Sequence, residues 1–118
     1  MMKLVQRAFL GLLLAAVLVG LPQVASAGRQ DFTIENQSGL AIIGLYVTPT
    51  SDYSWQEDIL GGSYLRDGEA MEIEFSRYDY DRYWDIMIEF ADGYVVTYSR
   101  FDLFRTGYIT VYYDSVEY

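Results

Sequence analysis

Apolar and polar residues alternate along most of this chain, which is the pattern of half-buried β-strands. The alternation predicts strands in residues 32–35, 71–75, 84–90, 94–99 and 108–113. Met71, Ile73 and Phe75 are expected to point inward. Phe32 and Ile34 alternate with polar residues, and Trp84, Ile86, Ile88 and Phe90 share one face of their strand. Asp92-Gly93 lies between two of these stretches and is a strong signal for a β-hairpin.

Residues 40–47 differ from the other stretches because they are apolar on both faces. One face would carry Ile43, Leu45 and Val47, and the other Leu40, Ile42 and Tyr46. A strand of this kind is normally covered on both sides. The pattern therefore predicts a central strand that ends at Pro49.

Residues 50–62 show no alternation and form the irregular part of the chain. Ser54 followed by Glu57 fits a capping box, and Gly61 fits the position after a helix end. One short helical turn is therefore expected near residues 54–61. Short strands separated by turns otherwise predict an all-β fold, a small antiparallel β-sandwich of about six to seven strands.

The first 27 residues have the layout of a secretory signal peptide. Lys3 and Arg7 precede an apolar run over residues 8–21, which Pro22 ends, and Ala25-Ser26-Ala27 fits a cleavage site. The run is too short to span a bilayer, which needs about 20 residues. Residues 1–27 are thus expected to be removed, leaving residues 28–118 as one domain that is exported to the periplasm or secreted.

Removal of the signal peptide makes the domain more acidic. Six arginines and 17 acidic residues remain, so the net charge falls from −9 to 6 − 17 = −11. This charge repels phosphate backbones, which argues against nucleic-acid binding, and it also argues against adsorption to anionic lipid. The chain has no cysteine. That excludes a disulfide and a lipoprotein anchor, so no membrane anchor is expected after cleavage.

Several short motifs are spread over most of the domain. They are Leu45-Tyr46-Val47-Thr48-Pro49, Trp55, Asp58-Ile59-Leu60-Gly61, Asp85-Ile86, Phe90-Ala91-Asp92-Gly93 and Asp102-Leu103. In these motifs the chain resembles a group of small exported bacterial β-sandwich domains that is functionally uncharacterised. The resemblance implies a fold and a compartment, without an activity. It also implies that Arg82 and Phe104 occupy the positions of a cysteine pair in other members.

The residue inventory argues against an enzyme. Residues 28–118 contain no histidine, cysteine or lysine, which removes the usual general base, thiol nucleophile and Schiff-base amine. A pair of carboxylates acting as a glycoside hydrolase is the remaining catalytic alternative. A domain of this size leaves little room for a deep cleft, so a non-catalytic role is expected.

Acidic residues in two loops suggest a calcium-stabilised domain as an alternative. Calcium binds six to eight oxygen ligands and tolerates irregular loops. Asp52, Glu57 and Asp58 lie in one loop, and Asp79 and Asp81 in another. Neither loop has the spacing of an EF-hand. Solvated acidic loops explain the same pattern, so no cofactor is expected apart from this Ca²⁺ alternative.

Aromatic residues are concentrated in the same two loops. Tyr78, Tyr80, Arg82 and Trp84 follow closely along one of them, and the other carries Tyr53 and Trp55. Aromatic rings beside carboxylates and guanidinium groups suit a sugar or a protein partner. The alternative is that these side chains only pack over the ends and open edges of the sandwich. The sequence favours a non-catalytic binding module of the bacterial envelope whose partner is an unknown protein or glycan.

Overall fold

The computed structural model describes residues 5–10, 29–76 and 78–118. Most of the predicted signal peptide lies outside the described residues, and only the backbone of its residues 5–10 is placed. The described part of the chain contains strands and no helix, so it holds no helix long and apolar enough to cross a membrane.

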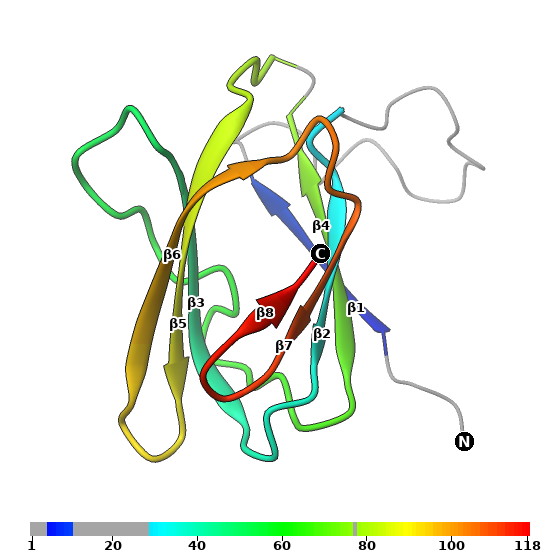
Figure 1. Cartoon of the computed structure of the whole chain (residues 1–118), viewed down its shortest axis with the longest axis vertical. Coiled ribbons are helices and arrows are strands. Elements are labelled where there is room, and N and C mark those ends of the chain that lie inside the picture. The colour runs from blue at the N-terminus through cyan, green and yellow to red at the C-terminus, as the bar shows by residue number, and fades with distance from the viewer. Residues whose placement is uncertain (1–4, 11–28, 77) are drawn as a thin grey trace.

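The fold is a small β-sandwich of two sheets (Figure 1). One sheet has five strands in the order β1-β4-β2-β7-β8, and the other has three in the order β3-β5-β6. The strands are β1 (Val5–Leu10), β2 (Phe32–Asn36), β3 (Ile42–Pro49), β4 (Ala70–Phe75), β5 (Tyr83–Phe90), β6 (Val95–Asp102), β7 (Tyr108–Val111) and β8 (Val116–Glu117). Seven of them lie in the predicted domain, in agreement with the expected fold class.

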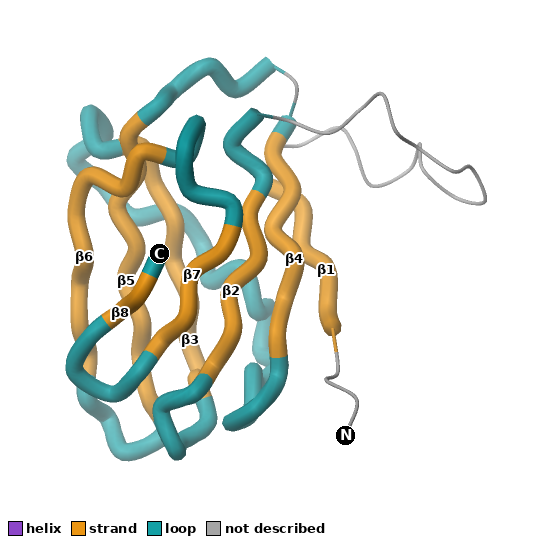
Figure 2. The backbone as a smooth tube through the Cα atoms, turned by 45° about the vertical axis from the view of Figure 1, so that its right-hand side comes forward, coloured by secondary structure: helices purple, strands orange, loops and turns teal. Residues whose placement is uncertain are grey.

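The pairing is antiparallel in most of the sandwich but not throughout. β2 runs antiparallel to β4 and parallel to β7. It therefore lies in the middle of the five-stranded sheet, between the pair β1-β4 and the pair β7-β8. β1 also pairs in parallel, along β4 at the end of the five-stranded sheet (Figure 2). Within residues 28–118 the expected antiparallel sandwich is thus confirmed apart from the β2–β7 pair, and local alternation does not reveal the crossovers on which parallel pairing depends.

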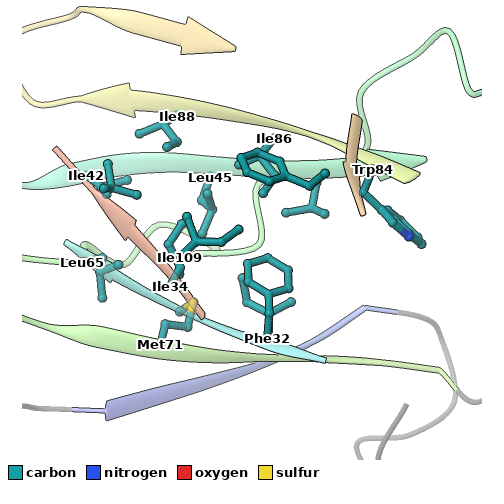
Figure 3. Packing of buried hydrophobic residues seen from close by; sticks show 14 of the residues in the cluster. Phe32, Ile34, Ile42, Leu45, Leu65, Met71, Trp84, Ile86, Ile88 and Ile109 are labelled. Atoms are coloured by element: carbon teal, nitrogen blue, oxygen red, sulfur yellow. The ribbon is translucent and has the colours of Figure 1, made fainter. Parts of the chain in front are cut away.

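The core lies between the two sheets, and the predicted inward positions are all buried in it. It combines Phe32, Ile34, Met71, Ile73 and Phe75 from the larger sheet with Trp84, Ile86, Ile88 and Phe90 from β5. Figure 3 shows Phe32, Ile34 and Met71 of the larger sheet facing Ile86 and Ile88 of β5. Glu72 and Glu74 alternate with these core residues along β4 and are only half-buried. The period of two thus identified both the strands and their inner faces.

β3 differs from its prediction in two respects. It lies at the edge of the three-stranded sheet, and a register shift between Ile42 and Gly44 turns both Ile42 and Leu45 inward. The second apolar face therefore does not exist as predicted, because one extra residue reverses the faces of a strand. At Gly44 an added Cβ would lie 3.1 Å from Glu89 Oε1, so the bulge brings its backbone close to β5.

Residues 50–65 cover the outer edge of β3. The Leu45 N–H donates to Asp58 Oδ1 over 2.9 Å, and the Leu45 carbonyl accepts from the Ile59 N–H over 2.9 Å. Ile42 and Leu65 exchange two further backbone hydrogen bonds of 2.8 and 3.0 Å. The loop therefore covers the edge of β3 as an additional strand would, and the strand needs no neighbour there.

The expected helical turn near residues 54–61 is wrong. These residues form an extended loop that ends in a turn, in which the Gly61 N–H donates to the Asp58 carbonyl over 3.1 Å. Gly61 and Gly62 both have positive φ values, 57° and 88°. The Ile59 N–H donates to the Leu45 carbonyl of β3, and the Leu60 and Gly61 N–H groups both donate to Asp58. None of these three groups donates to the carbonyl four residues earlier, as it would in a helix. Tertiary pairing has overridden the local capping signal.

The hairpin predicted at Asp92-Gly93 is confirmed. It joins β5 to β6, and Gly93 has a φ of 88°, which glycine adopts without strain. The Asp92 carboxylate accepts from the Tyr94 N–H over 3.0 Å and from the Tyr113 hydroxyl over 2.8 Å. The second of these bonds ties the hairpin to the last segment of the chain.

Candidate functional site

A groove with a volume of about 260 Å³ lies where β3 and β5 meet the loop after β3. Its walls are formed by Thr48, Thr50, Asp52, Tyr53, Ser54, Trp55 and Asp85. Thr48 is the register partner of Asp85 across the two strands, so these two residues share one face of the sheet. That face is opposite to the one formed by Val47 and Ile86, which are buried in the core. The groove therefore opens on the outside of the sandwich.

The aromatic part of the groove comes from the loop. Tyr53 is fully exposed, and Trp55 keeps 37 % of its surface exposed. Both side chains are therefore accessible from solvent, as an aromatic binding surface on this loop would require. Trp55 does not belong to the buried core cluster. Both rings are placed where a ligand in the groove would contact them.

The polar part of the groove is organised around Asp85. Its Oδ1 accepts from the Thr50 hydroxyl over 2.7 Å and from the Arg100 N–H over 3.0 Å. Arg100 has a φ of 63° at the point where the pairing of β5 with β6 shifts register. This bulge turns an N–H of β6 toward the Asp85 carboxylate, so the carboxylate is fixed in position before any ligand binds.

The loop side of the groove is held by two weaker contacts. Asp52 Oδ1 accepts from the Ser54 N–H over 3.3 Å, which is a local turn of the kind that aspartate favours. The Thr48 hydroxyl donates to the Ser54 carbonyl, also over 3.3 Å. The second contact joins the loop to β3, and the first holds the turn that contains Tyr53.

A cluster of two arginines and a tyrosine includes Arg100, whose N–H also contacts Asp85. Both guanidinium groups lie close to the Tyr83 ring. The guanidinium carbon of Arg100 is 4.7 Å from the ring centroid, and that of Arg82 is 5.5 Å from it. Arg82 also forms a two-pronged ion pair with Asp102, at 2.9 and 2.7 Å. The hydrogen bonds from Arg82 lower the pKa of the Asp102 carboxyl below its usual value. Arg82 is therefore held by neighbours, and Tyr83 and Arg100, which the sequence interpretation did not select, are exposed beside it.

Trp84 is buried, so its selection as part of an exposed binding surface does not fit its position. Only 4 % of its surface is exposed, and its ring lies 4.6 Å from that of Phe75 in an edge-to-face contact. The indole N–H donates to the Asp81 carbonyl over 2.9 Å. Trp84 occupies an inward position of β5, so the alternation that identified the strand also indicated this burial.

Tyr78 and Tyr80 remain exposed, at 58 % and 78 %, on the loop before β5. This loop is anchored by a residue that the sequence interpretation did not select. The buried Gln30 amide donates to the Asp79 carbonyl over 2.6 Å and to the Asp81 carbonyl over 3.2 Å. The two tyrosines therefore lie on an anchored loop, but neither lines the groove.

The five carboxylates proposed for calcium are not gathered into a site. Among the described residues no group of three or more acidic side chains is arranged to hold a metal ion. Asp58 accepts from the Leu45 and Leu60 N–H groups, each over 2.9 Å, and closes the edge of β3. Burial, opposed by a hydrogen bond and aided by Asp81, raises the pKa of Asp79. Glu57 is exposed and Asp52 belongs to the groove, so these residues serve different parts of the molecule.

The two positions for which the resemblance implies cysteines are neighbours in space. The Arg82 guanidinium carbon lies 5.8 Å from the centroid of the Phe104 ring, and the Leu103 N–H donates to the Arg82 carbonyl over 3.0 Å. In this chain a cation–π contact and the ion pair with Asp102 therefore connect the two segments.

Comparison of the chain with family models, curated proteins and solved structures finds no match.

Proposed function

We propose that this chain is an exported, non-catalytic binding module of the bacterial envelope, and that the groove between β3, β5 and the loop after β3 holds a glycan. The observation that carries the proposal is the combination of Tyr53 and Trp55 with a fixed carboxylate at Asp85 in one groove. Aromatic rings contact the apolar face of a sugar, and carboxylates and hydroxyls accept and donate to its hydroxyl groups.

The size and composition of the groove support a small polar ligand. Its volume of about 260 Å³ is below the ~300–1,000 Å³ typical of pockets for drug-sized molecules. This suits one sugar unit at the end or side of a longer glycan. Asp85 already accepts hydrogen bonds from Thr50 and Arg100 in the free protein. Its side chain therefore loses little conformational entropy when a ligand binds.

The residue inventory supports binding without catalysis. The domain has no histidine, cysteine or lysine to act as a base or nucleophile. Two carboxylates, Asp52 and Asp85, do line the groove, which is the one feature shared with glycoside hydrolases. Any glycan that binds should therefore also be tested for cleavage.

The predicted export is tested by expressing the full chain in a bacterium and isolating it from the periplasm or the medium. Cleavage after Ala27 predicts a protein whose intact mass corresponds to residues 28–118. An uncleaved chain retained in the cytoplasm would contradict the assignment to the envelope.

Binding is tested by titrating the exported protein with fragments of cell-wall and surface polysaccharides. Because Trp84 is buried and Trp55 exposed, the variant Trp84→Phe keeps the tryptophan beside the groove as a fluorescence reporter. We expect Trp55→Ala and Asp85→Ala to weaken binding at least about tenfold, the size typical of a lost ligand contact, as measured by isothermal titration calorimetry because Trp55→Ala removes the fluorescence reporter.

Tyr80→Ala is the matched control, because Tyr80 is an exposed aromatic residue that does not line the groove. It should bind like the parent protein. Loss of binding in Tyr80→Ala with retention in Trp55→Ala would place the binding site on the loop before β5 and refute the groove. Release of reducing sugar that depends on both Asp52 and Asp85 would replace the binding role with hydrolysis.

A further inference from the structure

We infer that removal of the signal peptide exposes the outer edge of β4, and that this edge then binds an extended segment of a partner protein that alternates apolar and basic residues and runs parallel to β4. The inference rests on the export proposed above. It concerns a second surface, at the edge of the five-stranded sheet and separate from the groove of the three-stranded sheet.

The structure shows that a strand fits this edge. β1 lies beside β4 (Figure 2). The two strands pair in parallel over six consecutive positions, from Val5 opposite Ala70 to Leu10 opposite Phe75, without a register shift. β1 is the last strand on this side of the sheet. It lies wholly within residues 1–27, so cleavage before Gly28 removes the strand and leaves β4 at the edge.

The hydrogen bonds of β4 identify the groups that cleavage would expose. The Phe75 N–H donates to Asp31 Oδ1 over 2.9 Å, and the Glu69 carbonyl accepts from the Asn36 N–H over 2.9 Å. Both bonds are on the β2 side, so the odd-numbered residues of β4 direct their backbone groups toward β2. Backbone groups alternate in direction along a strand. Those of residues 70, 72 and 74 therefore point toward β1.

The other three sheet edges of the sandwich are less suited to accept a strand. The edge of β3 is covered by residues 50–65, as described above. β6 carries a bulge at Arg100, which interrupts regular pairing, and β8 has only two residues. Bulges, short strands and covering loops are the usual protections of sheet edges. After cleavage β4 would have six regular residues and none of these protections.

The side chains of β4 define the partner. Glu72 and Glu74 lie on the outer face, and Met71, Ile73 and Phe75 face the core. A paired strand places its residues opposite these, so basic residues suit the outer positions and apolar residues the inner ones. The register with β1 has Arg7 opposite Glu72. A second copy of the chain suits the edge less well, because it would bring glutamates together and each domain has a net charge of −11.

The test uses the full chain, expressed with export and recovered in its processed form. Its intact mass is measured first, and the protein is then titrated with a fluorescent synthetic peptide of residues 3–10. We expect saturable binding by fluorescence anisotropy. Hydrogen exchange should show slower exchange at the amides of residues 70, 72 and 74, because these face the added strand.

A charge exchange provides the matched control. The Arg7→Glu form of the peptide should bind about fivefold more weakly, the size expected when an attractive cross-strand pair becomes repulsive. The Glu72→Arg variant of the protein should restore the binding of that peptide and weaken that of the original. Since the same folded protein is compared with two peptides, a folding defect cannot imitate this result.

Each remaining outcome contradicts a different statement. An unprocessed N-terminus would refute the export proposal and, with it, the vacant edge. A processed protein that shows no peptide binding would refute only the present inference. A processed protein that dimerises through β4, with dissociation in the Glu72→Arg variant or protection of residues 70, 72 and 74 on self-association, would replace the partner segment with a second copy.

Discussion

Replacing Asp58 with alanine should destabilise the domain strongly, although Asp58 lies in a surface loop. Its Oδ1 is the acceptor for the Leu45 N–H on β3 and for the Leu60 N–H in the following turn, each over 2.9 Å. Leu45 is fully buried, so its N–H has no access to water once the carboxylate is removed. The Asp58 carboxylate thus accepts the hydrogen bond that the carbonyl of a neighbouring strand would accept if the sheet continued beyond β3.

The expected cost follows from these two bonds. A buried donor left without an acceptor costs ~1–3 kcal/mol, and an ordinary hydrogen bond contributes ~0.5–1.5 kcal/mol. We assign the first range to Leu45 and the second to Leu60, which gives about 1.5–4.5 kcal/mol in the free energy of unfolding. For a domain of 60–100 residues, 1 kcal/mol shifts the melting temperature by about 4–8 °C. A loss near 3 kcal/mol would therefore lower it by about 12–24 °C.

The assay is urea denaturation followed by circular dichroism, with the unfolding midpoint and slope compared between variants. Glu57→Ala is the matched control, because Glu57 is the exposed neighbour in the same loop. It should change stability by less than ~0.5 kcal/mol. Asp58→Asn keeps an oxygen acceptor and should fall between the two. If Asp58→Ala costs no more than Glu57→Ala, the carboxylate does not hold the loop against β3, and the account of this edge is wrong.

Three further predictions concern the core, the hairpin and the metal alternative. Trp84→Ala should lose ~3–5 kcal/mol of stability and Trp55→Ala less than ~0.5 kcal/mol in thermal melts, because only the first empties a core position; equal losses would contradict the burial of Trp84. The hydrogen bond from the Tyr113 hydroxyl to Asp92 raises the pKa of Tyr113 from its ordinary 10 to about 12. The stability that this bond gives the folded domain is complete below pH 10 and is lost between pH 10 and 12, because the tyrosine ionises first in the unfolded chain. An ultraviolet alkaline titration should show this late tyrosine, and Asp92→Asn should bring it back toward 10. Finally, millimolar calcium chloride should leave the melting temperature unchanged, because the five candidate carboxylates are not gathered; a rise that saturates with concentration would restore the calcium alternative.

The strands and their inner faces could be predicted because both follow from the local period of two. The predicted inward residues Met71, Ile73 and Phe75 are buried, as are the apolar faces of the stretches 32–35 and 84–90, and the Asp92-Gly93 hairpin needed only a turn signal between two alternating stretches. Gly44 was a signal that the interpretation did not use. A glycine inside an apolar strand often marks a bulge, and here it accompanies the shift that reverses the faces of β3.

The candidate site could be predicted only in part. Exposure of Tyr53 and Trp55 was consistent with their irregular loop, but the partners that complete the groove come from elsewhere in the chain. Asp85 and Thr50 are 35 positions apart and meet through the pairing of β5 with β3. The positive φ of Arg100, which brings its N–H to Asp85, arises from a register shift between β5 and β6. No local pattern encodes which strands become neighbours.

The amino-acid sequence by itself determined what is local: the alternating strands, the hairpin, the acidic charge and the absence of histidine and cysteine. Tertiary structure decided what depends on contacts between distant segments. It placed Asp58 at the edge of β3, the Trp84 indole against the Asp81 carbonyl, and Arg82 in an ion pair with Asp102. The physical reason is that a carboxylate, an indole or a guanidinium offers the same groups to a ligand and to the backbone. Only the folded chain determines which of them is within hydrogen-bonding distance.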